Sequence, residues 1–212
     1  MSGLRRAMMR ASIHSGGELP TGYTAFDWVQ ADSTTGKAAI NTEFLINMPR
    51  STTQHRYTIE TAFARTEDFA VNWIGRFIMT NSNANYDMRV TLAKNGNKIN
   101  QLIFRYQCYA GGSYGQITDN PINIGEWHNV VLTYQDEEVI GGKLILDNTT
   151  YLVEALTGNA TNMPLYLLGY TGNDEVYPCR MARTKIYDYG VLAADLVPAM
   201  RDADGVVGFY DV

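Results

Sequence analysis

The stretch over residues 125–148, GEWHNVVLTYQDEEVIGGKLILDN, constrains the fold more than any other part of the chain. It predicts two strands joined by a polar, acidic turn. The first strand covers 126–135 and opens with Trp127, and the second covers 143–147. Successive side chains of a strand point to opposite faces of a sheet, so each strand has two distinct faces. The stretch therefore indicates a fold, and it contains no residue pattern that indicates a reaction.

The rest of the chain has the same texture, with about a dozen short strands separated by polar turns. Residues 87–94 and 99–109 are predicted to form a hairpin, because Asn95-Gly96 suits the two central positions of a type I′ turn. Only Leu192–Arg201 suggests a helix, and Pro198 limits it.

This pattern predicts an all-β fold in which two antiparallel sheets pack face to face as a β-sandwich. At 212 residues the chain is long enough for one such domain, and no linker divides it. We expect the sandwich to occupy residues 21–212.

Residues 1–20 differ from the rest and are expected to form a separate N-terminal arm. The arm places Arg5, Arg6 and Arg10 among methionines and alanines. Residues 4–11 suit a short helix, but a helix of about two turns is not stable alone in water. The segment is either a disordered tail or a docking arm that becomes ordered on a larger assembly.

Composition excludes several classes of function. The formal net charge is −5 and the pI is about 5.2, which argues against nucleic-acid binding, since that needs a basic face. No apolar run is long enough to cross a bilayer, so we expect no membrane insertion. The N-terminal arginines are not followed by an apolar segment, so we do not expect a secretory signal.

The two cysteines, Cys108 and Cys179, allow two interpretations. They are buried free thiols of a protein made in a reducing compartment, or they form one disulfide between distant strands. Two cysteines alone do not decide between these.

Candidate catalytic residues are few, and we expect a protein without enzymatic activity. Glycoside hydrolysis needs two carboxylates about 5 Å apart in retaining enzymes, whereas Glu60 stands alone on its strand. No Ser or Cys lies in a glycine elbow. His128 shares a strand face with Val130 and Leu132, which favours a hydrogen-bonded histidine of the sheet or core over a catalytic one.

Calcium is the one metal for which the turns offer ligands. Calcium takes six to eight oxygen ligands, and acidic turns supply them at Asp136, Glu138 and Asp174. The alternative is that these are ordinary solvated turn residues. No Cys/His cluster has the spacing of a zinc site, and no other cofactor is expected.

Carbohydrate binding requires exposed aromatic rings beside polar groups, and several polar loops carry tyrosines. The alternative is that these tyrosines cap strand ends. The three tryptophans, Trp28, Trp73 and Trp127, are expected in the core. The candidate sugar-contacting residues are Tyr86, Tyr109, Tyr114, Tyr170 and Tyr177.

The motifs at 126–134 and 142–148 resemble those of the concanavalin A-like, laminin G-like superfamily. There a W-H-x-V-x-x-T-Y strand precedes a G-x-L-x-x-D-G strand. Asn148 stands where Gly is usual, and Asn also tolerates the left-handed turn conformation. The resemblance implies that the β-sandwich predicted from the strand pattern is a jelly roll.

The C-terminal motifs KIY at 185–187, DLVPA at 195–199 and GVVGFYD at 205–211 resemble a subgroup found in phage structural proteins and gut bacterial surface proteins. The subgroup implies a non-enzymatic tail, fibre or decoration protein of the virion. The arm is then expected to dock on other virion proteins, and the loops to contact a host-surface glycan. By analogy with phage fibres, we expect a homo-oligomer. The alternatives are a carbohydrate-binding module or adhesin on a bacterial surface or outside the cell, and a degenerate glycosidase.

Overall fold

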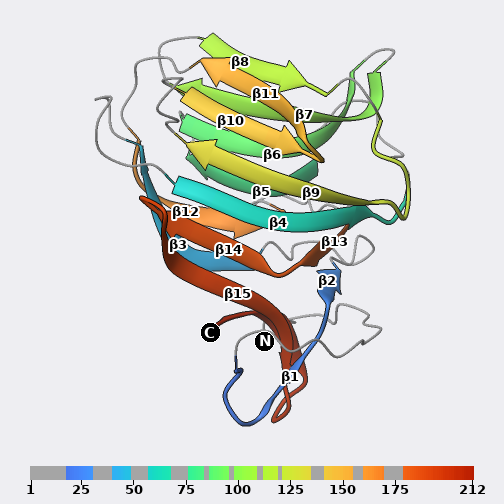
Figure 1. Ribbon diagram of the computed structural model, residues 1–212, viewed down its shortest axis with the longest axis vertical. Coiled ribbons are helices and arrows are strands. Elements are labelled where there is room, and N and C mark those ends of the chain that lie inside the picture. The colour runs from blue at the N-terminus through green and yellow to red at the C-terminus, as the bar shows by residue number, and fades with distance from the viewer. Residues whose placement is uncertain are drawn as a thin grey trace.

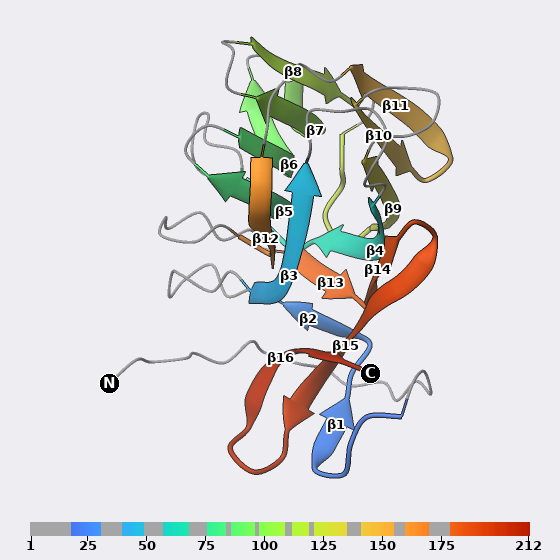
Figure 2. The same ribbon diagram turned by 90° about the vertical axis from the view of Figure 1, so that its left-hand side faces the viewer.

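The computed structural model describes residues 18–30, 40–48, 57–67, 76–83, 86–95, 98–108, 112–118, 121–134, 141–154, 160–169 and 179–212. These residues form two antiparallel sheets that lie in separate layers, as Figure 1 and Figure 2 show, so the predicted all-β sandwich is confirmed. Within these residues, no helix is long and apolar enough to cross a membrane. The predicted arm over 1–20 lies mostly outside them, and its role stays a prediction.

The larger sheet contains ten strands in the order β1-β15-β14-β4-β9-β10-β11, with β13 joining β4 to β2 and β16 beside β15. The strands are β1 (Tyr23–Ala25), β2 (Trp28–Gln30), β4 (Tyr57–Arg65), β9 (Trp127–Tyr134), β10 (Gly141–Leu146), β11 (Thr149–Glu154), β13 (Cys179–Ala182), β14 (Thr184–Asp188), β15 (Val191–Arg201) and β16 (Val206–Asp211).

The smaller sheet has the order β3-β12-β5-β6-β7-β8. Its strands are β3 (Ile40–Met48), β5 (Arg76–Asn83), β6 (Tyr86–Asn95), β7 (Lys98–Cys108), β8 (Gly112–Ile117) and β12 (Ala160–Leu167). The chain passes from one sheet to the other after β2, β3, β4, β8, β11 and β12, which is the crossing pattern of a jelly-roll sandwich.

The core lies between the two layers and follows from alternation along each strand. In β4, Ile59 and Phe63 have no exposed surface, and the residues between them are partly exposed or polar. Leu132 of β9 continues this inner face, and Val90 and Leu165 meet it from the smaller sheet. Burying one such side chain contributes roughly 1.5–3 kcal/mol to stability.

Both predicted hairpins are present. In the first, Gly142 of β10 pairs with Tyr134 of β9, and the turn between them lies outside the described residues. In the second, Asn95 of β6 pairs with Lys98 of β7. This pairing leaves residues 96–97 between the two strands, one position later than the predicted Asn95-Gly96.

The segment that suggested a helix is strand β15, and this correction has a simple physical reason. Residues 194–199 are all buried, so the strand lacks the alternation by which a half-buried strand is recognised. Its C-terminal half pairs with β1 on one side and β16 on the other, and this part projects below the two layers (Figure 1).

Cys179 is a free, buried thiol at the start of β13. Cys179 forms no disulfide in the structure, which supports the free-thiol interpretation for this residue.

Candidate functional site

A β-bulge between β13 and β14 shapes the outer face of the larger sheet. Met181 pairs with Phe63, and Lys185 pairs with Glu60, so four steps along β13–β14 match three along β4. The one extra residue is a bulge, which redirects side chains locally. No residue pattern in the sequence indicated this bulge.

A shallow groove of about 520 Å³ lies at the bulge. Phe63 and Val130 point into the core, so their neighbours Ala62 and Asn129 face outward. Small side chains at Ala62 and Ala182 leave the floor low between larger neighbours. The groove is lined by Glu60, Thr61, Ala62, Asn129, Val130, Val131, Ala182, Arg183 and Lys185.

Arg183 is held in place at one side of the groove. Its Nε and Nη2 groups donate to the two carboxylate oxygens of Asp195, whose side chain is only 7% exposed. The hydrogen bonds to Asp195 raise the pKa of Arg183, so the guanidinium stays charged. Three of its five N–H groups are not used by this pair and can meet a polar ligand.

Glu60 supplies an acceptor on the same face. The Tyr187 hydroxyl donates to Oε2 of Glu60 at 3.3 Å, and Lys185 lies opposite Glu60 on the neighbouring strand. Desolvation, followed by the charge of Glu60, raises the pKa of Tyr187. The groove therefore presents positively charged hydrogen-bond donors and a negatively charged acceptor on the same face.

Trp127 is 43% exposed, so the prediction that it lies in the core is wrong. It pairs with Ala64, two residues before the pair formed by Asn129 and Ala62, and therefore lies on the same outer face. The alternation that turns His128 inward requires Trp127 to point outward, and this signal was present in the sequence.

The other tryptophans differ from Trp127. Trp28 of β2 is partly buried, and the Arg180 guanidinium lies 4.5 Å from its ring centroid, a cation–π contact. Trp73 lies outside the described residues, so its place in the core stays a prediction.

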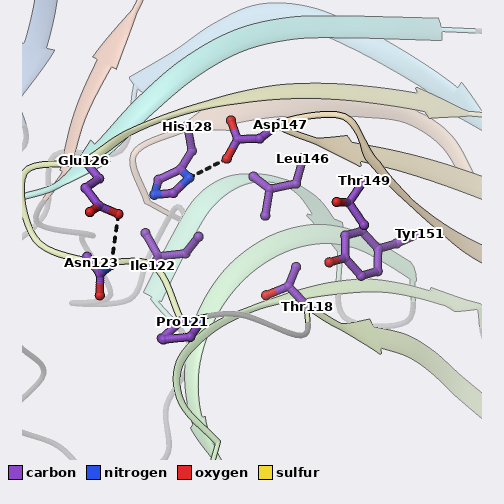
Figure 3. Close-up of a pocket in the computed structure, with 10 residues that line it drawn as sticks. All are labelled: Thr118, Pro121, Ile122, Asn123, Glu126, His128, Leu146, Asp147, Thr149 and Tyr151. Carbon is purple, nitrogen blue, oxygen red and sulfur yellow. Dashed lines mark hydrogen bonds and ion pairs between the residues drawn. The ribbon is translucent and has the colours of Figure 1, made fainter.

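A second depression, of about 240 Å³, lies at one end of the sandwich between the start of β9 and the turn from β10 to β11 (Figure 3). His128 lies on its wall and donates from Nδ1 to Oδ2 of Asp147 at 2.6 Å. The prediction of a hydrogen-bonded histidine is thus confirmed. The lining residues are Thr118, Pro121, Ile122, Asn123, Glu126, His128, Leu146, Asp147, Thr149 and Tyr151.

Most of the predicted site residues stay untested. Tyr86 begins β6 and Tyr114 lies in β8, both on the smaller sheet and away from the groove, and their side chains are outside what the structure describes. Among the described residues, no three His, Cys, Asp or Glu side chains gather as a metal would require. The remaining candidates all lie in undescribed segments: Tyr109, Tyr170, Tyr177, Asp136, Glu138, Asp174, Arg5, Arg6 and Arg10.

No family model matches the sequence, and no curated protein matches it at a significant level. Several solved structures are similar in fold. Trypanosoma rangeli sialidase in complex with sialic acid aligns over 77% of this chain and 26% of its own, with 12% identity and a TM-score of 0.48. The chain thus spans about a quarter of the sialidase.

Two smaller proteins align over most of their own length. The Ruminococcus gnavus IT-sialidase CBM40 bound to alpha2,3 sialyllactose covers 71% of this chain and 90% of its own, with 14% identity and a TM-score of 0.46. The SAP-like pentraxin from Limulus polyphemus covers 71% and 73%, with 8% identity and a TM-score of 0.44. At these scores the likeness carries no argument about ligand or activity, and the fold assignment rests on the strand pairing described above.

Proposed function

We propose that this protein is a lectin-like, non-enzymatic binding protein that holds a glycan in the groove on the outer face of its larger sheet. The observation that carries the proposal is Trp127, a large aromatic ring exposed on the same face as the groove, two residues before the lining residue Asn129 on β9. An indole ring offers a flat apolar surface on which the C–H face of a sugar ring can pack.

The polar groups of the groove suit the rest of a sugar. Asn129 carries an amide with both donors and acceptors, Arg183 keeps free N–H groups, and Glu60 accepts. Binding sites combine an apolar surface with a few fixed polar groups that set orientation. Since the groove contains both positively and negatively charged side chains, it suits a neutral or a weakly charged glycan.

The carboxylates of the groove support binding without cleavage. Among the described residues that line the groove, Glu60 is the one acid, and the carboxylate of Asp195 is already paired with Arg183. Glycoside hydrolases need a pair of carboxylates that flank the scissile bond. Tests for released reducing sugar with candidate glycans are therefore expected to be negative, and release abolished by Glu60→Gln would show a glycosidase instead.

A glycan array tests the proposal with a matched control. Trp127→Ala is expected to lose array binding, and Leu152→Ala is expected to keep it. Leu152 has the same 43% exposure and lies on the same face, two strands away on β11. Equal loss in both variants, or no glycan bound by the wild type, would contradict the proposal.

The place of action is proposed from the sequence resemblance. We propose a virion component, a tail, fibre or decoration protein that assembles as a homo-oligomer, docks through its N-terminal arm and contacts a host-surface glycan. A bacterial cell-surface or extracellular carbohydrate-binding protein is the alternative. Mass spectrometry of purified phage particles separates these, because absence of the protein from particles would leave the alternative.

A further inference from the structure

The pocket at the end of the sandwich is separate from the groove and has a different chemistry. Its wall is formed by the inner side of the β9–β11 ends and by the segment 121–126 that leads into β9 (Figure 3). Water occupies about 30 Å³ per molecule in the liquid, so 240 Å³ equals about eight water molecules. This is below the usual size of sites for drug-sized ligands, and it fits a small group or a single sugar.

The polar atoms of this pocket are mostly acceptors. Glu126 and Asp147 bring carboxylates, and Thr118, Thr149 and Tyr151 bring hydroxyls that can accept or donate. None of the ten lining residues is Lys or Arg. Such a lining disfavours an anionic ligand and favours one that donates several hydrogen bonds.

His128 adds an acceptor whose orientation is fixed. Because an ionised carboxylate only accepts, the contact with Asp147 places the ring proton on Nδ1. In the neutral ring, Nε2 is then an acceptor. Nε2 is buried and has no hydrogen-bond partner among the described residues, and it points toward the side of the pocket where Glu126 and Asn123 lie (Figure 3).

A buried polar atom without a partner is uncommon in folded proteins and costs stability. Beside it, Asn123 donates from Nδ2 to Oε2 of Glu126 at 2.9 Å, which fixes the carboxylate at the pocket wall. Glu126 and His128 thus present two acceptors of different kinds to the same side of the pocket.

We propose that this pocket binds a primary ammonium group, with Glu126 and Nε2 of His128 as its main acceptors. An ammonium has three N–H donors and no acceptor, which matches a lining rich in acceptors and without cationic residues. An amino sugar and a lysine side chain share this group. The described acidic and histidine side chains do not gather as a metal ion would require, which favours the ammonium over a bare cation.

Titration of the full chain by calorimetry tests the proposal with three probes. Glucosamine and Nα-acetyl-lysine amide carry the ammonium, and N-acetylglucosamine is the uncharged counterpart of the first. Glucosamine or the lysine probe is expected to bind, and N-acetylglucosamine to bind at least about tenfold more weakly, since a charge-assisted hydrogen bond is worth that much. The stronger of the two amines identifies the source of the group.

A pair of variants locates the site. Glu126→Gln is expected to weaken amine binding by about tenfold or more, and Glu67→Gln, another exposed carboxylate outside the pocket, is expected to leave it unchanged. Urea unfolding checks that both variants fold. Trp127→Ala is expected to keep amine binding, which makes this result independent of the groove.

Three results would overturn the proposal: neither amine binds, N-acetylglucosamine binds as tightly as the stronger of the two amines, or Glu126→Gln and Glu67→Gln behave alike.

Discussion

Asp147 holds His128 from the turn that follows β10, through a hydrogen bond of 2.6 Å between Nδ1 of the ring and Oδ2. The same residue binds the backbone of Asn129 twice. Its Oδ1 accepts from the Asn129 amide at 2.8 Å, and its own amide donates to the Asn129 carbonyl at 3.0 Å. One turn residue therefore extends the contact between β9 and β10 beyond the last ladder pair.

Asp147→Ala is expected to destabilise the protein by about 1–2 kcal/mol, because it removes two side-chain hydrogen bonds from a site that is partly exposed. Urea unfolding of wild type and variant measures this difference. Asp202→Ala is the control, because it removes one exposed hydrogen bond from Thr24 and is expected to cost less than Asp147→Ala. Equal losses of unfolding free energy in the two variants would show that the contact with His128 adds nothing to stability.

Substitutions at Asn148 test the turn between β10 and β11. Asp147 and Asn148 have φ values of 52° and 98°, and Leu146 pairs with Thr149, so the two residues form a tight turn of the type I′ kind. Asn148→Gly removes left-handed strain, which is smaller for Asn than the roughly 1–2 kcal/mol of most other residues, and adds about 0.4–1 kcal/mol of entropy to the unfolded chain. The two effects nearly cancel, so the unfolding free energy is expected to change by less than about 0.5 kcal/mol. Asn148→Val is expected to be destabilising.

This turn illustrates what the sequence could predict. The pair of strands around it was predicted from local alternation, and Asn148 was understood as a substitute for Gly in a left-handed position. These features depend on neighbours in the chain. The bulge at Arg183 depends on pairing with β4, which lies more than a hundred residues earlier, and no local pattern shows it.

The candidate site was predicted less well than the fold. The tyrosine loops were chosen from composition, which does not say which face a residue occupies. Trp127 was assigned to the core, although its neighbour His128 had been given the inward face. The segment 194–199 was hard to recognise as a strand for a different reason. Both of its faces are buried, so its sequence lacks the alternation of apolar and polar residues that identifies a half-buried strand.

Arg183 is expected to matter for stability as well as for binding. Arg183→Met leaves the Asp195 carboxylate buried without its cation, which is expected to cost about 2–3 kcal/mol. The value is below that of a fully buried pair, because Arg183 is 30% exposed. Lys185→Met, a change of the same charge in the same groove, is expected to cost less than about 0.5 kcal/mol in urea unfolding. A similar loss in both variants would contradict the structural role of the pair.

Cys179 is expected to lower the free energy of unfolding at alkaline pH. Burial raises the pKa of its thiol, so above about pH 8.5 the unfolded chain releases this proton and the folded protein keeps it. Stability from this group is complete below that pH and falls as pH rises. Between pH 7 and 9.5, wild type is expected to lose up to about 1.4 kcal/mol more than Cys179→Ala, as measured by urea unfolding. Parallel pH profiles would contradict this.

The central claim is that a glycan packs on Trp127 at the outer groove, and NMR of the indole N–H groups tests it most directly. The chain has 3 tryptophans, and the signal that disappears in Trp127→Phe assigns Trp127. On titration with the strongest glycan from the array, we predict that the Trp127 indole signal and the amides of Asn129 and Ala182 shift together, with the same saturation. Shifts confined to Tyr86 and Tyr114 of the smaller sheet, with Trp127 unchanged, would contradict the account.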